Sequence, residues 1–343
     1  MSLHRDILRR QFLKDANAEH MHLDPMHQDA SFRRYFRLSD ERHRRLLMDA
    51  PPPQEDLGKW IDIASHLTAI DLHPPKIFKA DQVNGFALIE DFGDNTFTKL
   101  LNDHKDPEGL YGPAIDLLVH LHQHQNAMAI DIPSYDLQTL MTEAHLLTDW
   151  FLPVVNDQAL SSSLEEQYTN AWSAILSQLP SPAVSLVLRD FHVDNLMLIC
   201  GNTSNHQIGL LDFQDARIGP IAYDIVSLLE DARRDIAEPF ASKMLERYTD
   251  AMPLLDMQNF ELWYCVLAAQ RHCKVLGIFS RLAIRDHKTQ YLAHLTRVLR
   301  LLQKNLEFPV LAPLKEWLDQ VIGDRGIPVE IDLVRIRTTL EIS

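Results

Sequence analysis

The sequence predicts an α+β protein of two lobes, a small β-rich N-terminal lobe and a larger, mostly helical C-terminal lobe. Strand-like segments gather at the start of the chain, whereas helical periodicity dominates from residue 107 onward. The length of 343 residues and the 46% hydrophobic content are sufficient for two packed lobes. We place the N-terminal lobe at residues 1–91 and the C-terminal lobe at residues 92–343.

The N-terminal lobe is predicted to be a small sheet with one helix. Four of its segments have strand character: residues 31–38, 45–50, 76–80 and 86–91. The last two flank the turn-forming sequence DQVNG and therefore read as a hairpin. Between the two pairs of strands, apolar residues recur at helical spacing from Leu57 to Leu67, and the prolines at 74 and 75 end that helix.

The C-terminal lobe is predicted to be helical except for three short strands, at residues 184–189, 196–200 and 208–212. Its cysteines, like those of the whole chain, lack any C-x-x-C spacing. We therefore expect Cys200, Cys265 and Cys273 to be buried thiols rather than members of a disulfide framework or a zinc site.

The charge balance indicates the class of partner. With 33 basic and 48 acidic residues the formal net charge is -15, which argues against a general affinity for nucleic acid or anionic membranes. The N-terminal sequence MSLHRDILRR is charged where a signal peptide is apolar, and no apolar run approaches the roughly 20 residues of a membrane span. We expect a cytoplasmic protein that binds small molecules, with no obligate protein partner evident.

The segment LRDFHVDN, residues 188–195, precedes two strands joined by a polar turn. Since such strands lie side by side, Asn195 before the first and Asp212 at the end of the second should meet at one edge, and Asp190 lies on the loop that leads there. Phosphoryl transfer needs oxygen ligands for Mg²⁺ and a carboxylate that accepts the proton of the attacking hydroxyl. Any one Asp can cap a turn, but this ordered set matches that chemistry.

This arrangement resembles the catalytic loop of protein kinases and, more closely, the aminoglycoside phosphotransferase family, with D-x-x-x-x-N and then D-x-x-x-A-x-x-G-P-x-x-x-D. The second pattern runs here from Asp212 to Asp224. The resemblance implies a two-lobed protein-kinase-like fold, ATP as phosphoryl donor and Mg²⁺. It also implies Asp190 as catalytic base, Asn195 and Asp212 as metal ligands, and Asp224 as a structural carboxylate. His192 stands where protein kinases carry a lysine near the transferred phosphate, so it contacts phosphate or substrate, or only hydrogen-bonds the loop.

The nucleotide site departs from the kinase pattern in one respect. The third strand carries Met48 where a kinase has its phosphate-binding lysine. Arg33 and Arg34 lie in the turn that would cover the nucleotide and can bind phosphate, or else face solvent on an exposed hairpin. The resemblance further implies that backbone groups around Glu90 and Phe92 bind adenine.

Four stretches resemble the bacterial anomeric sugar kinases that phosphorylate N-acetylmuramate and N-acetylglucosamine at C1: DASFRRYFRL with MDAPP, RDFHVDNLM, LDFQDARIGPIAYDIVSLL and QRHCKVLGIFSRLAIRDHKTQYL. If a helix runs unbroken through Gly277, the last stretch forms a basic stripe of Arg271, Lys274, Arg281 and Arg285. We expect this stripe, with Asp190, to bind the sugar; the alternative is a solvated face paired with acidic residues.

The resemblance therefore implies an ATP-dependent phosphotransferase that acts on the anomeric hydroxyl of an amino sugar such as N-acetylmuramate or N-acetylglucosamine. Two alternatives stay open, another hydroxyl kinase of the aminoglycoside or choline type, and a nucleotide-binding pseudokinase that acts as an interaction module. A basic stripe has the wrong sign for aminoglycosides, which are polycations.

Overall fold

The computed structural model describes residues 3–26, 32–156, 159–199, 208–323, 326–328 and 330–342. The chain divides into two compact units. The first comprises residues 1–131 and 190–216, and the second comprises residues 132–189 and 217–343. The predicted lobes at 1–91 and 92–343 stay a prediction, because these units are defined by compactness alone.

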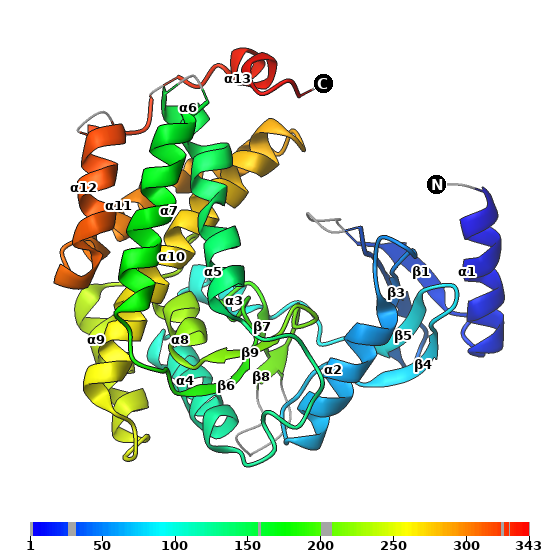
Figure 1. Ribbon diagram of the computed structural model, residues 1–343. Coiled ribbons are helices and arrows are strands. Elements are labelled where there is room, and N and C mark those ends of the chain that lie inside the picture. The colour runs from blue at the N-terminus through cyan, green and yellow to red at the C-terminus, as the bar shows by residue number, and fades with distance from the viewer. Residues whose placement is uncertain are drawn as a thin grey trace. The chain divides into compact units, whose positions relative to one another are not determined.

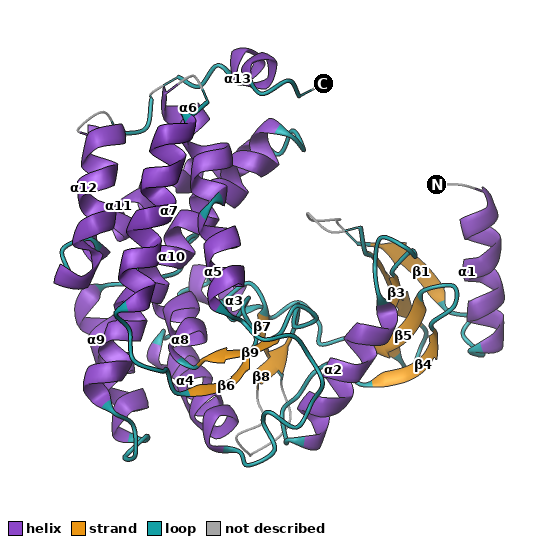
Figure 2. Cartoon of the chain, viewed as in Figure 1, coloured by secondary structure: helices purple, strands orange, loops and turns teal. Residues whose placement is uncertain are grey.

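The first unit contains an antiparallel five-stranded sheet of order β1-β2-β3-β5-β4 (Figure 2). Its strands are β1 (His22–Pro25), β2 (Arg34–Ser39), β3 (Arg44–Asp49), β4 (Ile77–Asp81) and β5 (Phe86–Glu90). Helix α1 (Leu3–Asp15) packs on this sheet, where the ring of Phe12 stacks on Phe86 at 5.6 Å between centroids. The four predicted strands are confirmed within three residues at each end, whereas α1 and the short, mostly exposed β1 were not predicted.

The predicted helix after the third strand is confirmed as α2 (Leu57–Ala69). It begins where the carboxylate of Asp56 accepts the backbone N–H of Lys59, and it buries Trp60 and Leu67 on one face. The remaining elements of the first unit are α3 (Phe97–Asn102), α4 (Glu108–Gln123), β7 (Leu196–Leu198) and β8 (Ile208–Leu210). The polar turn at residues 201–207 and Cys200 lie outside the described residues.

Among its described residues, the second unit is helical apart from one pair of antiparallel strands, β6 (Val184–Val187) and β9 (Arg217–Pro220) (Figure 1). Its longer helices are α5 (Leu137–Ala144), α7 (Ser162–Ser177), α8 (Ala222–Leu229), α9 (Glu238–Asp250), α10 (Met257–Ile284), α11 (Leu295–Asn305), α12 (Ala312–Val321) and α13 (Leu333–Thr339). Shorter helical segments are η1 (Leu147–Phe151), α6 (Leu152–Asn156), η2 (Thr289–His294) and η3 (Pro309–Leu311).

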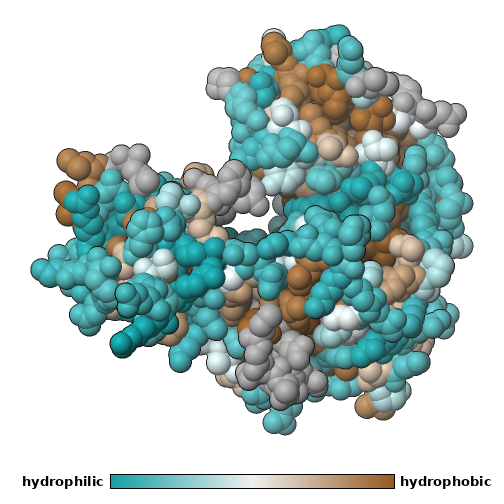
Figure 3. Space-filling view, turned by 180° about the vertical axis from the view of Figure 1, so that it is seen from behind, coloured by the Kyte–Doolittle hydropathy of each residue, from teal (hydrophilic) through white to brown (hydrophobic). Residues whose placement is uncertain are grey.

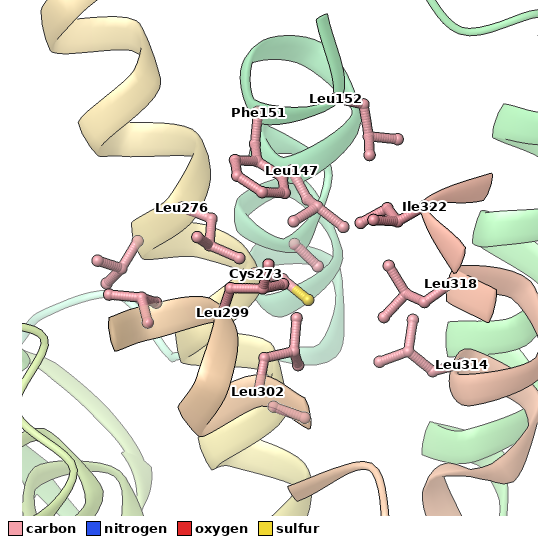
Figure 4. Packing of buried hydrophobic residues seen from close by; sticks show 14 of the residues in the cluster. Leu147, Phe151, Leu152, Cys273, Leu276, Leu299, Leu302, Leu314, Leu318 and Ile322 are labelled. Atoms are coloured by element: carbon pink, nitrogen blue, oxygen red, sulfur yellow. The ribbon is translucent and has the colours of Figure 1, made fainter. Parts of the chain in front are cut away.

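The core of the second unit forms around α10, which packs against α5, α8, α11 and η1. Figure 4 shows Leu147 and Phe151 of η1 in one cluster with Leu276 of α10, Leu299 of α11 and Leu318 of α12. On the outside, Figure 3 shows hydrophilic residues over most of the visible face and hydrophobic ones gathered in an upper region of this unit.

The expected burial of the cysteines is confirmed for Cys265 and Cys273, both free thiols. Burial raises the pKa of Cys273 to about 12, so this thiol stays protonated and behaves as a core residue. Among the helices that the structure describes, none is both long and apolar enough to cross a membrane.

Helix α10 runs unbroken through Gly277, as the basic stripe required. A Cβ atom at this position would lie 2.1 Å from the carbonyl oxygen of Leu146, which is backbone and cannot rotate away. Gly277 therefore lets α10 approach the start of η1 closely.

We predict that Gly277→Ala destabilises the protein by about 3 kcal/mol, because the added methyl overlaps backbone and forces a shift of the packed helices. Gly109→Ala in α4 is the control, since a Cβ there meets its nearest atom at an ordinary 3.6 Å. Its effect should stay below about 1 kcal/mol. Denaturant unfolding measures both variants, and equal stabilities would contradict the close approach.

Candidate active site

The strand pair β7–β8 brings the predicted metal ligands to one edge. Leu196 pairs with Leu210 in an antiparallel register, and the backbone N–H of Leu211 donates to the carbonyl oxygen of Asn195 at 3.0 Å. Asp212 is the next residue along the chain. The hydrogen bond between Leu211 and Asn195 extends the strand pairing by one residue, and this extension brings Asn195 and Asp212 close together as predicted.

The loop before β7 is held by its own hydrogen bonds. The side-chain amide of Asn195 donates from Nδ2 to the carbonyl oxygen of Asp190 at 3.0 Å, and the backbone N–H of Asn195 donates to His192 O at 2.9 Å. Because its nitrogen is used in this way, Asn195 has its amide oxygen left for a cation. Asp190 is half-buried on the same loop.

His192 is buried, and its Nε2 lies 3.4 Å from Nδ2 of Asn195. This contact favours the alternative in which His192 supports the loop through Asn195. The contact between His192 and phosphate or substrate stays a prediction.

A cavity of about 490 Å³ lies within the first unit, in the size range of small-molecule sites. Five of the residues predicted to bind nucleotide line it: Arg33, Glu90, Phe92, Asn195 and Asp212. Leu46, Ile89 and Met197 line the same cavity and give it an apolar part. The cavity therefore combines apolar walls, suited to a flat base, with charged groups suited to phosphates and a metal ion.

The two predicted phosphate-binding arginines diverge because neighbouring residues along an extended chain point to opposite faces. The guanidinium of Arg33 lies 2.9 Å from Asp212 Oδ1 at the cavity, whereas Nη2 of Arg34 lies 3.0 Å from Oδ2 of Asp49. Asp49 is fully buried and also pairs with Arg5 of α1. Arg34 thus belongs to a structural ion pair, and Arg33 is the arginine at the site.

Sequence reasoning missed a further arginine, Arg37 of β2, whose Nε lies 2.8 Å from Asp91 Oδ2. It also pairs with Asp94 at 2.9 Å and donates to the carbonyl oxygen of Gly93 at 3.2 Å. In an extended chain every second residue lies on the same face, so Arg33 and Arg37 share a face. This spacing was the signal in the sequence that could have identified Arg37. Arg37 fixes the chain where it leaves β5 and lines the cavity.

The charged groups of the cavity shift one another's pKa values. Partial removal from water raises the pKa of Asp212, the guanidinium of Arg33 opposes this rise, and the charge of Asp190 adds to it. Burial alone would lower the pKa of Arg33, but Tyr35, Asp212 and Glu55 together raise it. Arg33 therefore remains charged and partly neutralises an acidic site.

The donor set fits Mg²⁺. Asn195 and Asp212 offer an amide and a carboxylate oxygen, and Mg²⁺ in phosphoryl-transfer sites is held by one or two such ligands together with substrate phosphates. The guanidinium already beside Asp212 indicates that this carboxylate attracts a cation. Among the described residues there is no group of three His, Cys, Asp or Glu side chains suited to a metal.

Asp224, in the second unit, holds the residues that directly precede Asp190 in the chain. This fully buried carboxylate on α8 accepts the backbone N–H of Leu188 at 2.6 Å and that of Arg189 at 2.8 Å. Arg189 has a left-handed φ of +69°, a conformation that side chains other than glycine rarely adopt. The two hydrogen bonds hold this strained residue, which directly precedes Asp190 in the chain.

The side chain of Arg189 belongs to a buried charge cluster of the second unit. Glu143 pairs with Arg189 and, at 3.0 Å, with Lys274, and it accepts a hydrogen bond from Tyr135. Burial opposes ionisation of Glu143, but Lys274, Arg189 and Tyr135 together lower its pKa below the ordinary value. The cluster is therefore charged and internally paired.

In the predicted basic stripe on α10, three side chains are paired with other residues and one is not paired with any described residue. Arg271 is buried and donates to Ser227 Oγ at 2.7 Å, Lys274 joins Glu143, and exposed Arg285 pairs with Asp286 at 2.7 Å. Half-buried Arg281 makes no ion pair and no side-chain hydrogen bond to any residue that the structure describes. A role in sugar binding stays a prediction for all four.

Comparison with known proteins identifies relatives over most of the chain. Residues 22–263 match the model of the phosphotransferase enzyme family. The N-acetylmuramate/N-acetylglucosamine kinase of Pseudomonas aeruginosa is 36% identical over 308 residues, covering 86% of this chain and 87% of the relative. The protein of the same name from Neisseria meningitidis is 33% identical and covers 87% and 90%.

Solved structures resemble this chain in fold. A putative aminoglycoside phosphotransferase from Ralstonia eutropha superposes with a TM-score of 0.63 at 12% identity, over 90% of this chain and 98% of its own. The aminoglycoside phosphotransferase APH(2'')-Ib, solved with ADP bound, gives 0.58 at 15% identity, over 90% and 100%. At these identities the likeness concerns the fold, and the predicted protein-kinase-like fold is confirmed.

We predict that Asp224→Asn destabilises the protein by about 2 kcal/mol, because an amide has one acceptor oxygen and turns its NH₂ toward a backbone donor. Asp256→Asn is the control, since Asp256 caps α10 and Asn caps a helix equally well. Denaturant unfolding compares the two variants. A loss no larger than that of the control would contradict the bonding assigned to Asp224.

Proposed function

The chain belongs to the phosphotransferase enzyme family, and we propose that it transfers the γ-phosphoryl group of ATP to the anomeric hydroxyl of N-acetylmuramate or N-acetylglucosamine. The observation that carries this proposal is the convergence of Asn195 and Asp212 at one cavity, with Asp190 on the adjoining loop. The choice of sugar is supported by the names of relatives that cover most of the chain.

In this proposal the base of ATP occupies the apolar part of the cavity, against Leu46 and Ile89. The carboxylate of Glu90 already accepts the backbone N–H of Lys76 at 3.1 Å, so this side chain is engaged. Backbone groups that follow Glu90 in the chain would therefore bind adenine. Arg33 lies at the charged part of the cavity and would bind phosphate oxygens.

Asn195 and Asp212 would hold Mg²⁺ at the charged end of the cavity. When bound, the ion would neutralise charge on the β- and γ-phosphates. The carboxylate of Asp190 would accept the proton of the anomeric hydroxyl as that oxygen bonds to the γ-phosphorus. The bond from this phosphorus to the oxygen that bridges it to the β-phosphate breaks, and ADP leaves with the electron pair. The anomeric hydroxyl suits a single carboxylate base, because the ring oxygen makes it more acidic than an ordinary sugar hydroxyl.

We predict that Asp190→Asn lowers kcat by roughly 10²–10⁴-fold, because the amide cannot accept the proton of the sugar hydroxyl. The dissociation constant for Mg-ADP should stay within about twofold of wild type, since the role assigned to Asp190 is toward the sugar. Coupled ADP release measures turnover and calorimetry measures binding. A variant with near wild-type turnover would remove Asp190 from the mechanism.

The site of phosphorylation is a separate prediction. With either amino sugar the product should be a 1-phosphate, recognised by a ³¹P resonance coupled to the anomeric proton and by loss of reducing-sugar reactivity. A phosphate on the 6-hydroxyl, or turnover only with aminoglycosides or choline, would overturn the choice of substrate and leave the kinase assignment intact.

We predict that Arg281→Gln raises the KM for N-acetylmuramate by roughly tenfold, since this half-buried cation is available to the lactyl carboxylate. The KM for N-acetylglucosamine, which lacks that carboxylate, should not change. Arg285→Gln is the matched control, because Arg285 lies four residues along the helix and is exposed and paired with Asp286. Equal effects on both sugars would exclude Arg281 from carboxylate recognition.

A further inference from the structure

The charged part of the cavity contains an arginine held between two carboxylates. Nη2 of Arg33 donates to Asp212 Oδ1 at 2.9 Å, and Nε lies 3.3 Å from Glu55 Oε2. The side chain of Arg33 is only 8% exposed. A buried guanidinium in this position must be paired, so Glu55 contributes to whether Arg33 can stay beside Asp212.

Glu55 also fixes the backbone that carries Arg33. Its second carboxylate oxygen, Oε1, accepts the backbone N–H of Phe32 at 3.2 Å, directly before Arg33 in the chain. One carboxylate thus bonds the main chain just before β2 and lies beside the guanidinium as an ion pair, while Nη1 of Arg33 donates to Gln214 Oε1 at 2.7 Å. This double contact restricts the directions in which Arg33 can point.

The position of Glu55 is itself fixed relative to the segment that carries Asp212. Glu55 immediately precedes Asp56, the cap of α2, and donates its backbone N–H to Pro51 O at 3.1 Å. One turn further along α2, the ring of Trp60 stacks on Phe213 with centroids 5.3 Å apart. The start of α2 and the residues after β8 therefore form one packed substructure within the first unit.

This arrangement corresponds to a known requirement of protein kinases, in which a third-strand lysine reaches the phosphates and is paired with a glutamate of the following helix. Here Met48 of β3 cannot serve, and it is fully buried. Arg33 comes instead from the position directly before β2, and its glutamate comes from the residue before the cap of α2.

We propose that Glu55 is a positioning residue that holds Arg33 at Asp212, so that the Arg33–Glu55 pair anchors the nucleotide phosphates in place of the missing lysine. The inference rests on the proposed function, because it assumes that this cavity binds a nucleotide with its metal ion. Glu55 acts through Arg33 and does not itself contact the nucleotide. In the nucleotide complex Arg33 bonds phosphate oxygens while Glu55 continues to hold its Nε side.

The test is the binding of Mg-ADP to the full chain, measured by calorimetry without sugar so that no turnover is needed. Glu55→Gln keeps an acceptor for the N–H of Phe32 but removes the charge beside Arg33. We expect the dissociation constant for Mg-ADP to rise by roughly tenfold, the loss typical of one charge-assisted contact, and the KM for sugar to stay unchanged. Asp56→Asn is the matched control, because it removes a neighbouring negative charge and retains the helix cap.

A double-mutant cycle separates positioning from a merely structural effect. In the Arg33→Ala background, Glu55→Gln should weaken Mg-ADP binding no further, because the residue through which Glu55 acts is absent. If Glu55→Gln lowers the melting temperature, Arg33→Lys provides the second measurement, since an ammonium keeps the charge but loses the fork that spans two carboxylates. It should also weaken Mg-ADP binding.

The outcomes distinguish this inference from the proposed function. A wild-type chain that does not bind Mg-ADP overturns the proposed function. Suppose instead that the wild-type chain binds Mg-ADP. If Glu55→Gln then binds equally well, or if the effects in the cycle are additive, the positioning role of Glu55 is overturned while the proposed function stands.

Discussion

The hydrogen bond from the N–H of Leu211 to the carbonyl oxygen of Asn195 is the constraint on which the site depends. It places the amide of Asn195 and the carboxylate of Asp212 at one edge of a strand pair only a few residues long. The negative charge of Asp212 would repel a phosphate, so a cation must lie beside it. Arg33 provides that charge in the structure, and Mg²⁺ provides it in the proposed complex.

A second constraint orders the chain just before Asp190. Asp224 accepts two successive backbone N–H groups, and it thereby fixes Arg189 in a left-handed conformation. Glu143 then holds the side chain of Arg189 in a paired cluster with Lys274. These buried carboxylates thus bind backbone N–H groups and the side chains of Arg189 and Lys274. Their role is to hold the structure rather than to bind substrate.

The elements that carry strong local signals were predictable from sequence. The hydrophobic period gave α2, and the ordered spacing of Asp190, Asn195 and Asp212 indicated the edge on which two of them now lie. Tertiary pairing was not predictable. A helical wheel groups Arg271 with Arg281 but does not say which neighbour each will meet, and Ser227 lies 44 residues from Arg271 in the chain. Likewise, sequence alone treated Arg33 and Arg34 as equivalent, although the alternation of a strand sends them to different carboxylates.

The central claim is that one metal ion binds between Asn195 and Asp212 and carries the nucleotide phosphates. Anomalous diffraction from crystals grown with Mn²⁺ and ADP tests it most directly, because Mn²⁺ replaces Mg²⁺ and is located without ambiguity. We predict an anomalous peak that places the Mn²⁺ ion within bonding distance of Asn195 Oδ1, of a carboxylate oxygen of Asp212 and of the β-phosphate. A metal ion bound to the phosphates but away from both side chains would contradict the account.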